Sequence, residues 1–74
     1  MRDLRPTKRQ QQVLSMIARH QSLHGYPPTV RELAAALGIR SISGVGEHLR
    51  RMAAKRLLTW EPGKSRTLRV IGGL

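Results

Sequence analysis

The stretch Thr29–Lys55 reads TVRELAAALGIRSISGVGEHLRRMAAK and carries the strongest structural signal in this chain. Thr29 and Glu32 have the spacing of a capping box, in which the two side chains each satisfy a backbone amide at a helix start. Gly38 is suited to a left-handed helix cap, and Ser41 can cap another helix three residues later. Two short helices joined by a tight turn containing glycine are typical of a helix-turn-helix.

A longer helix is expected before this stretch. Thr7 and Gln10 form a second capping box, apolar residues follow at helical spacing, and Gly25 ends the pattern. Pro27 and Pro28 then predict an extended linker, because each proline biases the preceding residue away from the α region.

Two β-strands are expected after the helices. Leu57–Glu61 and Thr67–Ile71 have the composition of strands, and the turn residues Pro62–Ser65 lie between them. The second helix of the helix-turn-helix, which begins after Ser41 and ends before this hairpin, would bury an apolar stripe. The expected core consists of Leu14, Ile17, Leu33, Leu37, Val45 and Leu49 from the helices and Leu58, Trp60, Leu68 and Val70 from the hairpin.

The predicted fold class is therefore α+β, mainly α. It is a winged helix-turn-helix, in which three helices are followed by a two-stranded β-hairpin wing. We expect helices over 7–24, 29–37 and 41–55 and the wing hairpin over 57–71, all within a single domain of residues 1–74.

The composition points to a polyanionic partner. The chain has 14 Lys and Arg residues against 4 Asp and Glu residues, which gives a net charge of +10 in 74 residues. Between positions 40 and 74 only Glu47 and Glu61 offset the basic residues, whereas ordinary surfaces intersperse both signs. Tyr26 and Trp60 are the only aromatic residues, so a stacking platform for single strands is disfavoured and both rings are expected to pack internally.

Other classes of protein are disfavoured. The chain has no Cys, which excludes disulfide and thiolate zinc sites and fits a reducing cytoplasm. No apolar run comes near the length of about 20 residues that spans a membrane, and we expect no secretory signal. His20 and His24 are expected to be surface residues rather than metal ligands, and the four acidic residues form no paired site. We therefore expect no enzyme and no cofactor.

Three segments resemble the amino-terminal DNA-binding domain of LexA-type SOS repressors: Thr7–Leu14, Gly25–Ala34 and Glu47–Leu49. The resemblance extends from Leu4 to Val70 without an insertion. It implies a cytoplasmic transcriptional repressor of bacterial or phage origin, whose third helix docks in the major groove of operators. The self-cleaving half of that family has no counterpart in this sequence, so an excised domain and a stand-alone relative both stay open.

The resemblance implies base-reading contacts at the start of the third helix, at Ser41, Ser43, Gly44, Gly46 and Glu47, and it assigns the wing contact to Arg66. Glu47 can accept from a cytosine amino group. The residues expected at the DNA backbone are Lys8, Arg9, Arg40, His48, Arg50, Arg51, Lys64 and Arg66. Packing beside the turn is the alternative for His48, and a weak helix start is the alternative for the two glycines.

Three positions depart from the family pattern. Ile42 stands where many members have Pro, and Gly46 stands where a side chain often reaches the bases. Arg56 stands where Gly is usual, and a left-handed conformation there would cost about 1 kcal/mol.

The sequence thus predicts specific binding to double-stranded DNA by a repressor or its isolated DNA-binding domain. A monomer in solution is expected because no apolar helix is left over, and two copies could occupy adjacent half-sites. Two other functions stay open at this stage: a protein-interaction module that contacts RNA polymerase or another regulator, and a basic RNA-binding module.

Overall fold

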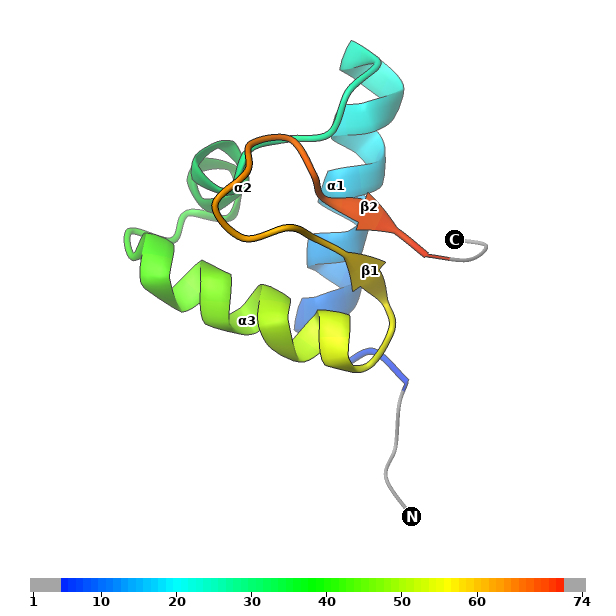
Figure 1. Ribbon diagram of the computed structural model, residues 1–74, viewed down its shortest axis with the longest axis vertical. Helices are drawn as coiled ribbons and strands as arrows, with labels where there is room; N and C mark the ends of the chain where they lie inside the picture. Colours follow the sequence, from blue (N-terminus) through cyan, green and yellow to red (C-terminus); the bar gives the residue numbers. More distant parts are fainter. Residues whose placement is uncertain (1–4, 72–74) are drawn as a thin grey trace.

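The computed structural model describes residues 5–71. Its elements are α1 (Lys8–His24), α2 (Val30–Leu37), α3 (Ile42–Ala54), β1 (Leu58–Thr59) and β2 (Arg69–Val70), in the arrangement of Figure 1. The predicted order of three helices and an antiparallel hairpin is confirmed, with Leu58 paired to Val70 and Thr59 paired to Arg69. The ends of the expected domain, residues 1–4 and 72–74, lie outside the described residues.

Side-chain caps start each helix. Thr7 Oγ1 accepts from the amide of Gln10 at 3.1 Å, and Gln10 Oε1 accepts from the amide of Thr7 at 3.0 Å. Thr29 and Glu32 make the same reciprocal pair at 3.0 and 2.9 Å. Both predicted capping boxes are therefore confirmed, and the sequence correctly locates the starts of α1 and α2.

The end of α3 has an unusual residue at its cap. The amide of Leu57 donates to the carbonyl of Met52 at 3.0 Å, and the amide of Arg56 donates to that of Ala53 at 2.9 Å. These two bonds form a Schellman motif, which requires a left-handed residue and normally uses glycine. Arg56 fills that position with φ 62°, so the left-handed conformation considered for this departure from the family pattern is present.

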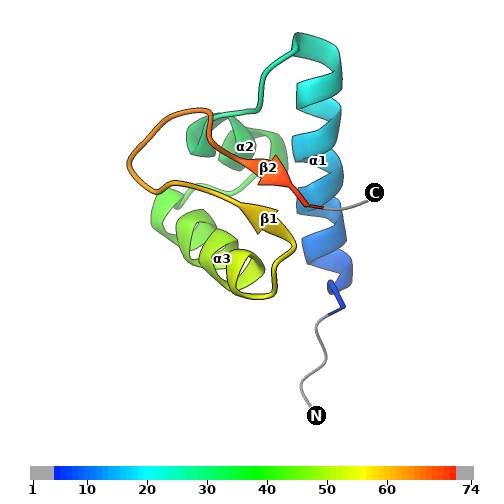
Figure 2. The same ribbon diagram turned by 45° about the vertical axis from the view of Figure 1, so that its right-hand side comes forward.

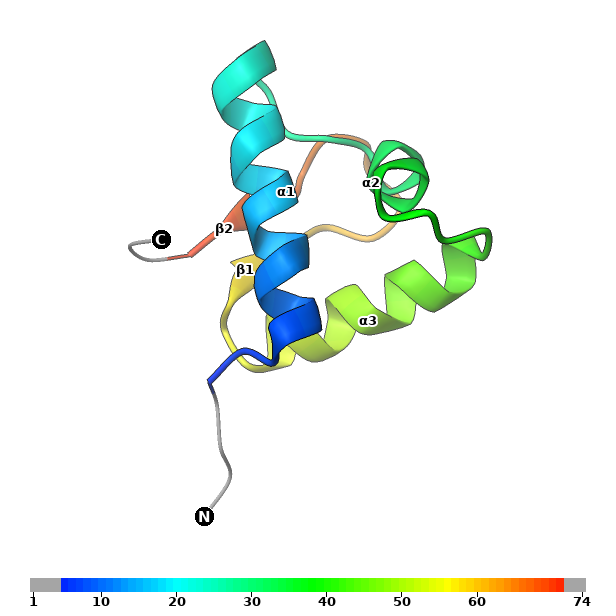
Figure 3. The same cartoon turned by 180° about the vertical axis from the view of Figure 1, so that it is seen from behind.

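The hairpin closes the gap between two helices. β1 packs against α3 and β2 packs against α1, while α2 contacts both α1 and α3 (Figures 1 and 2). Seen from behind, α1 crosses in front of the strands (Figure 3). The buried apolar side chains are Val13, Leu14, Ile17, Leu33, Ala34, Val45, Leu49, Met52, Leu58 and Leu68. Leu37, Trp60 and Val70, which were expected in the core, are only partly buried around it.

The strands are much shorter than expected. Each has two residues, whereas the composition of the chain predicts strands of five. The difference lies in the wing loop, where Thr67 replaces a ladder with side-chain bonds: its hydroxyl accepts from the amide of Glu61 at 3.0 Å and lies 3.2 Å from the carbonyls of Glu61 and Lys64. The wing is therefore mostly loop, and its shape depends on side-chain contacts.

Candidate nucleic-acid interface

The outward face of α3 carries polar and charged side chains. Ser43, Glu47, Arg50 and Arg51 are exposed, whereas Val45, Leu49 and Met52 are buried. The exposed residues are three or four positions apart, so they form one strip along the helix. Glu47 Oε1 lies 3.7 Å from Arg51 Nη2, and both side chains are about 70% exposed. This strip offers donors and an acceptor to a partner.

The first turn of α3 is held by its cap. Ser41 Oγ accepts from the amide of Gly44 at 3.1 Å, which leaves the hydroxyl hydrogen available to donate. A Cβ added at Gly44 would lie 3.5 Å from Ser41 Oγ, an ordinary contact distance. Packing within the domain therefore does not require glycine at position 44.

Gly46 lies on the edge of α3 that faces the wing. A Cβ at this position would approach Trp60 Cη2 at 3.7 Å, and the residue is half-buried. Of the five residues expected to read bases, Gly46 is thus set apart from the exposed strip that holds Ser43 and Glu47. The sequence does not reveal this, because the position of Trp60 depends on how the hairpin folds back.

His48 lies on the opposite edge of α3. Its Nε2 atom is buried and has no hydrogen-bond partner among residues 5–71. Burial lowers the pKa of the His48 imidazole below its usual value, and the nearby charges of Arg9 and Arg51 lower it further. The neutral ring is therefore favoured, which fits packing better than an ionic contact. The same proximity places Arg9, at the start of α1, beside α3.

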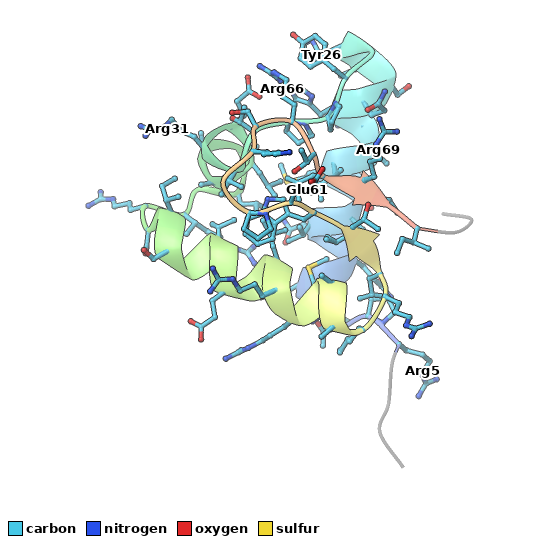
Figure 4. The ribbon with its side chains drawn as sticks, viewed as in Figure 1. Arg5, Tyr26, Arg31, Glu61, Arg66 and Arg69 are labelled. Atoms are coloured by element: carbon cyan, nitrogen blue, oxygen red, sulfur yellow. The ribbon has the colours of Figure 1, made fainter. Side chains whose placement is uncertain are left out.

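A groove of about 570 Å³ separates the first turn of α2 from the wing. Ile42 at the start of α3 and Trp60 contribute to its walls, and Lys64 and Arg31 line it from opposite sides. Figure 4 shows Arg31 on the outer edge of α2. Arg31 was not among the residues expected at DNA. Its signal was its third place in the capping box, where it points outward while Glu32 turns back to the helix start.

The remaining basic residues expected at DNA are mostly open to solvent. Lys8, Arg9, Arg40 and Arg50 are exposed, and Arg9 Nη1 donates to Gln12 Oε1 at 3.0 Å. Lys64 is 73% exposed, with Nζ 3.8 Å from Glu61 Oε1.

Arg66 is placed differently from the other predicted contacts. Its guanidinium turns back onto α2, where Nη1 donates to Glu32 Oε1 at 3.0 Å, and it stacks on the Tyr26 ring. The expectation that this side chain reaches DNA therefore meets a competing set of contacts within the domain.

The histidines of α1 belong to the same neighbourhood. His20 Nδ1 lies 3.0 Å from the carbonyl of Tyr26, and its ring is 4.3 Å from that of His24. Within the described part of the chain, no group of three or more His, Cys, Asp or Glu side chains could hold a metal ion. None of the helices in residues 5–71 is long and apolar enough to cross a membrane.

Three helices, an exposed third helix and a basic hairpin beside it define a winged helix-turn-helix domain. The family model described as LexA DNA binding domain matches residues 1–67, so the chain belongs to that family. It is 56% identical over 63 residues to a LexA repressor of Sorangium cellulosum, and 52% identical over 62 residues to one of Anaeromyxobacter. It is 46% identical over 66 residues to LexA repressor 2 of Geobacter sulfurreducens.

These matches cover most of this chain and a minor part of each relative. The aligned regions are 85%, 84% and 89% of the chain, against 27%, 27% and 32% of the three repressors. The similarity thus concerns a DNA-binding domain, and the remaining lengths of the relatives have no counterpart in it.

Proposed function

We propose that this chain binds specific sequences of double-stranded DNA as a LexA-type repressor domain, with α3 in the major groove. The observation that carries the proposal is the exposed strip of Ser43, Glu47, Arg50 and Arg51 on α3, in a chain of the LexA DNA-binding family with a net charge of +10. A major groove admits one α-helix, and its base edges present donors and acceptors to such a strip.

Within this proposal, the residues of α3 share the work of base reading. Ser41 and Ser43 offer hydroxyls, Gly44 permits close approach of the backbone, and Glu47 accepts from a cytosine amino group. Gly46 contributes less directly, because it lies on the edge of α3 beside Trp60. Specificity for the DNA sequence then depends mainly on the exposed strip of α3.

Phosphate contacts supply position and most of the affinity. Arg50 and Arg51 flank the base-reading strip, Lys8 and Arg9 approach from the start of α1, and Lys64 approaches from the wing. Arg40 and Arg31 are further candidates at the two ends of α2. His48 is a weaker candidate because its imidazole is half-buried and favours the neutral form.

The LexA repressors to which the chain is similar support a role in transcription. The chain represses transcription by occupying promoter DNA in a bacterial or phage-infected cytoplasm, without catalysis and without a cofactor. Residues 1–74 act as one domain, monomeric in solution. Two copies bind adjacent half-sites, because the symmetry of an operator mirrors that of its protein.

Selection of bound sites from random duplex DNA tests both binding and sequence preference. The variant Arg50→Gln/Arg51→Gln should bind duplex DNA much more weakly, whereas the charge-matched control Arg19→Gln/Arg69→Gln should bind as the wild type does, because Arg19 lies in the second half of α1 and Arg69 lies on β2, which packs against α1. An equal loss of DNA binding in both variants would mean that the chain binds DNA only through its overall positive charge. Recovery of no motif together with competition by structured RNA would replace DNA with RNA as the partner.

A further inference from the structure

Arg66 connects the wing to the helix-turn-helix. Its Nη1 atom donates to Glu32 Oε1 and to the carbonyl of Pro27, each at 3.0 Å, and Nη2 lies 3.4 Å from Glu32 Oε2. The guanidinium carbon is 4.3 Å from the centre of the Tyr26 ring, and Figure 4 shows the two side chains together. A two-pronged contact with a carboxylate, combined with stacking on an aromatic ring, is a geometry that arginine satisfies and lysine does not.

The acceptor side of this contact is also held by bonds that do not involve Arg66. Glu32 Oε1 already accepts from the amide of Thr29 at 2.9 Å in the capping box of α2. That backbone bond and the Arg66 guanidinium lower the pKa of the Glu32 carboxyl below its usual value, so it is charged at neutral pH. Pro27 is buried, and the carbonyl of Tyr26 is 3.0 Å from His20 Nδ1. Glu32 therefore presents a fixed anion on a rigid part of the fold.

The wing, in contrast, has little of its own to fix it. The hairpin ladder has two residues on each side, and the loop between the strands is largely exposed. Arg66 itself has φ 60°, a conformation that disfavours residues other than glycine and persists only where its surroundings impose it. The contacts of Arg66 with Glu32 and Pro27, which lie 34 and 39 positions earlier in the chain, can impose this backbone conformation.

We propose that Arg66 is a positioning residue of the wing: through Glu32 it holds the wing loop, and with it Lys64, beside the start of α3. This inference rests on the proposed binding to DNA. It assigns Arg66 to a clamp inside the protein and leaves Lys64 as the wing residue that contacts phosphate. The groove between α2 and the wing is then formed before DNA arrives, so the wing is ordered at no further entropic cost on binding.

The clamp predicts that removing the charge of Glu32 lowers the affinity for DNA, whereas charge alone would raise it. Removing an acidic charge from a protein that binds a polyanion should strengthen binding. Glu32→Gln instead weakens binding about 2- to 10-fold if Glu32 orders the wing, since the loop must then be ordered during association. Glutamine preserves the capping box, so the start of α2 is kept. If Arg66 were a phosphate contact restrained by Glu32, the same substitution would release it and tighten binding.

The matched control is Glu61→Gln. Glu61 is an exposed acid of the wing, 67% exposed, and its ion pair, at 3.8 Å, is with Lys64 Nζ, whereas that of Arg66 is with Glu32. Glu61→Gln removes one acidic charge, as Glu32→Gln does, but from the wing instead of α2 and outside the ion pair of Arg66 with Glu32. Binding by this variant should be unchanged or tighter, so a loss restricted to Glu32→Gln cannot come from charge alone.

The experiment measures duplex affinity for the wild type, Glu32→Gln, Arg66→Ala, the double variant and Glu61→Gln, with ¹⁵N relaxation of the free proteins. The clamp requires that the double variant binds no worse than Arg66→Ala alone, and that the amides of Gly63–Arg66 become mobile in Glu32→Gln while those of α2 stay rigid. Unchanged or tighter binding by Glu32→Gln, additive losses, or a wing that stays rigid would overturn it. Failure of the wild type to bind duplex DNA would remove the proposed function instead, and the relaxation data would still decide the clamp.

Discussion

At the scale of single residues, Arg56 holds a backbone conformation that favours glycine. Its φ of 62° follows from the Schellman motif at the end of α3, and its side chain is exposed. We expect Arg56→Gly to raise the free energy of unfolding by about 0.5–1 kcal/mol, because the strain exceeds the added flexibility of the unfolded chain. For a domain of this size that raises Tm by several degrees, with about 4–8 °C for each kcal/mol.

The control for this prediction is Arg56→Ala, which removes the same charged side chain but keeps Cβ. Alanine should give no gain, since the strain comes from Cβ in the left-handed region. Thermal unfolding of the two variants separates the causes. An equal gain from both would show that charge repulsion, rather than backbone strain, destabilises this position.

Glu47 is the residue whose effect on specificity is most distinctive. It is 69% exposed on the outward strip, and its contact with Arg51 at 3.7 Å is an exposed ion pair worth about 0–1 kcal/mol at most. Because the fold gains little from this acid, we expect Glu47→Ala to fold normally. The variant should keep or raise nonspecific affinity and lose about 1–3 kcal/mol of discrimination at one base pair.

Binding of wild type and Glu47→Ala to the selected site and its single-base variants checks this expectation. Ser22 is an exposed residue of α1, and Ser22→Ala serves as a control that should leave the base preference intact. If Glu47→Ala keeps every base preference but binds all sequences more weakly, Glu47 orients Arg51 and reads no base.

At the scale of elements, sequence patterns were most informative where structure is local. The capping boxes at Thr7 and Thr29 and the cap at Ser41 each depend on residues within a few positions, and the expected arrangement occurs at all three. The winged architecture followed from the order of these elements. The lengths of the strands could not be predicted in this way, because composition does not distinguish a ladder of backbone hydrogen bonds from a loop closed by the Thr67 hydroxyl.

The part of the candidate site that the sequence could not predict depends on distant contacts. Arg66 has the charge and position of a wing contact, but its ion pair with Glu32 joins residues 34 positions apart. Gly46 has the position of a base reader, but its edge of α3 is set by Trp60 on the returning hairpin. In both cases the residue type is compatible with two roles, and the contacts between elements that bear on the choice are not visible in the sequence.

The junction of α1 with α3 gives a prediction for pH. The pKa of His48 is lowered from 6.5 by burial and by Arg9 and Arg51, so below pH 6.5 the unfolded chain binds a proton that the folded chain resists. The unfolded state therefore binds more protons there, and the free energy of unfolding falls as pH decreases. The carboxyl of Glu32 adds a similar loss only below 4.5.

His48→Leu should flatten this pH dependence, because it removes the titrating ring and its unpartnered nitrogen. Denaturant unfolding between about pH 7.5 and about pH 5 measures the slope, in the range where histidines titrate. His24→Ala removes an exposed histidine and should keep the slope of the wild type. A slope in His48→Leu as steep as that of the wild type would place the responsible group elsewhere.

At the scale of the whole molecule, charge is distributed unevenly with respect to function. The net charge is +10, but only part of it can face one duplex, since Arg19 and Arg69 lie on α1 and β2 and Arg66 is paired with Glu32. Counterion release depends on the number of phosphates that are neutralised, not on the net charge of the protein. The salt dependence of binding therefore counts the residues of the interface.

We expect a slope of log affinity against log salt of about −3 to −5, which corresponds to four or five phosphate contacts by Arg50, Arg51, Lys64 and the start of α1. Arg50→Gln/Arg51→Gln should make the slope shallower by about two units, whereas Arg19→Gln/Arg69→Gln, which removes as much net charge, should leave it unchanged. The measurement is a titration of one duplex at several salt concentrations for the three proteins. A wild-type slope shallower than about −1 would contradict phosphate binding altogether. Equal changes in both variants would mean that the whole surface, rather than the face of α3, meets the DNA.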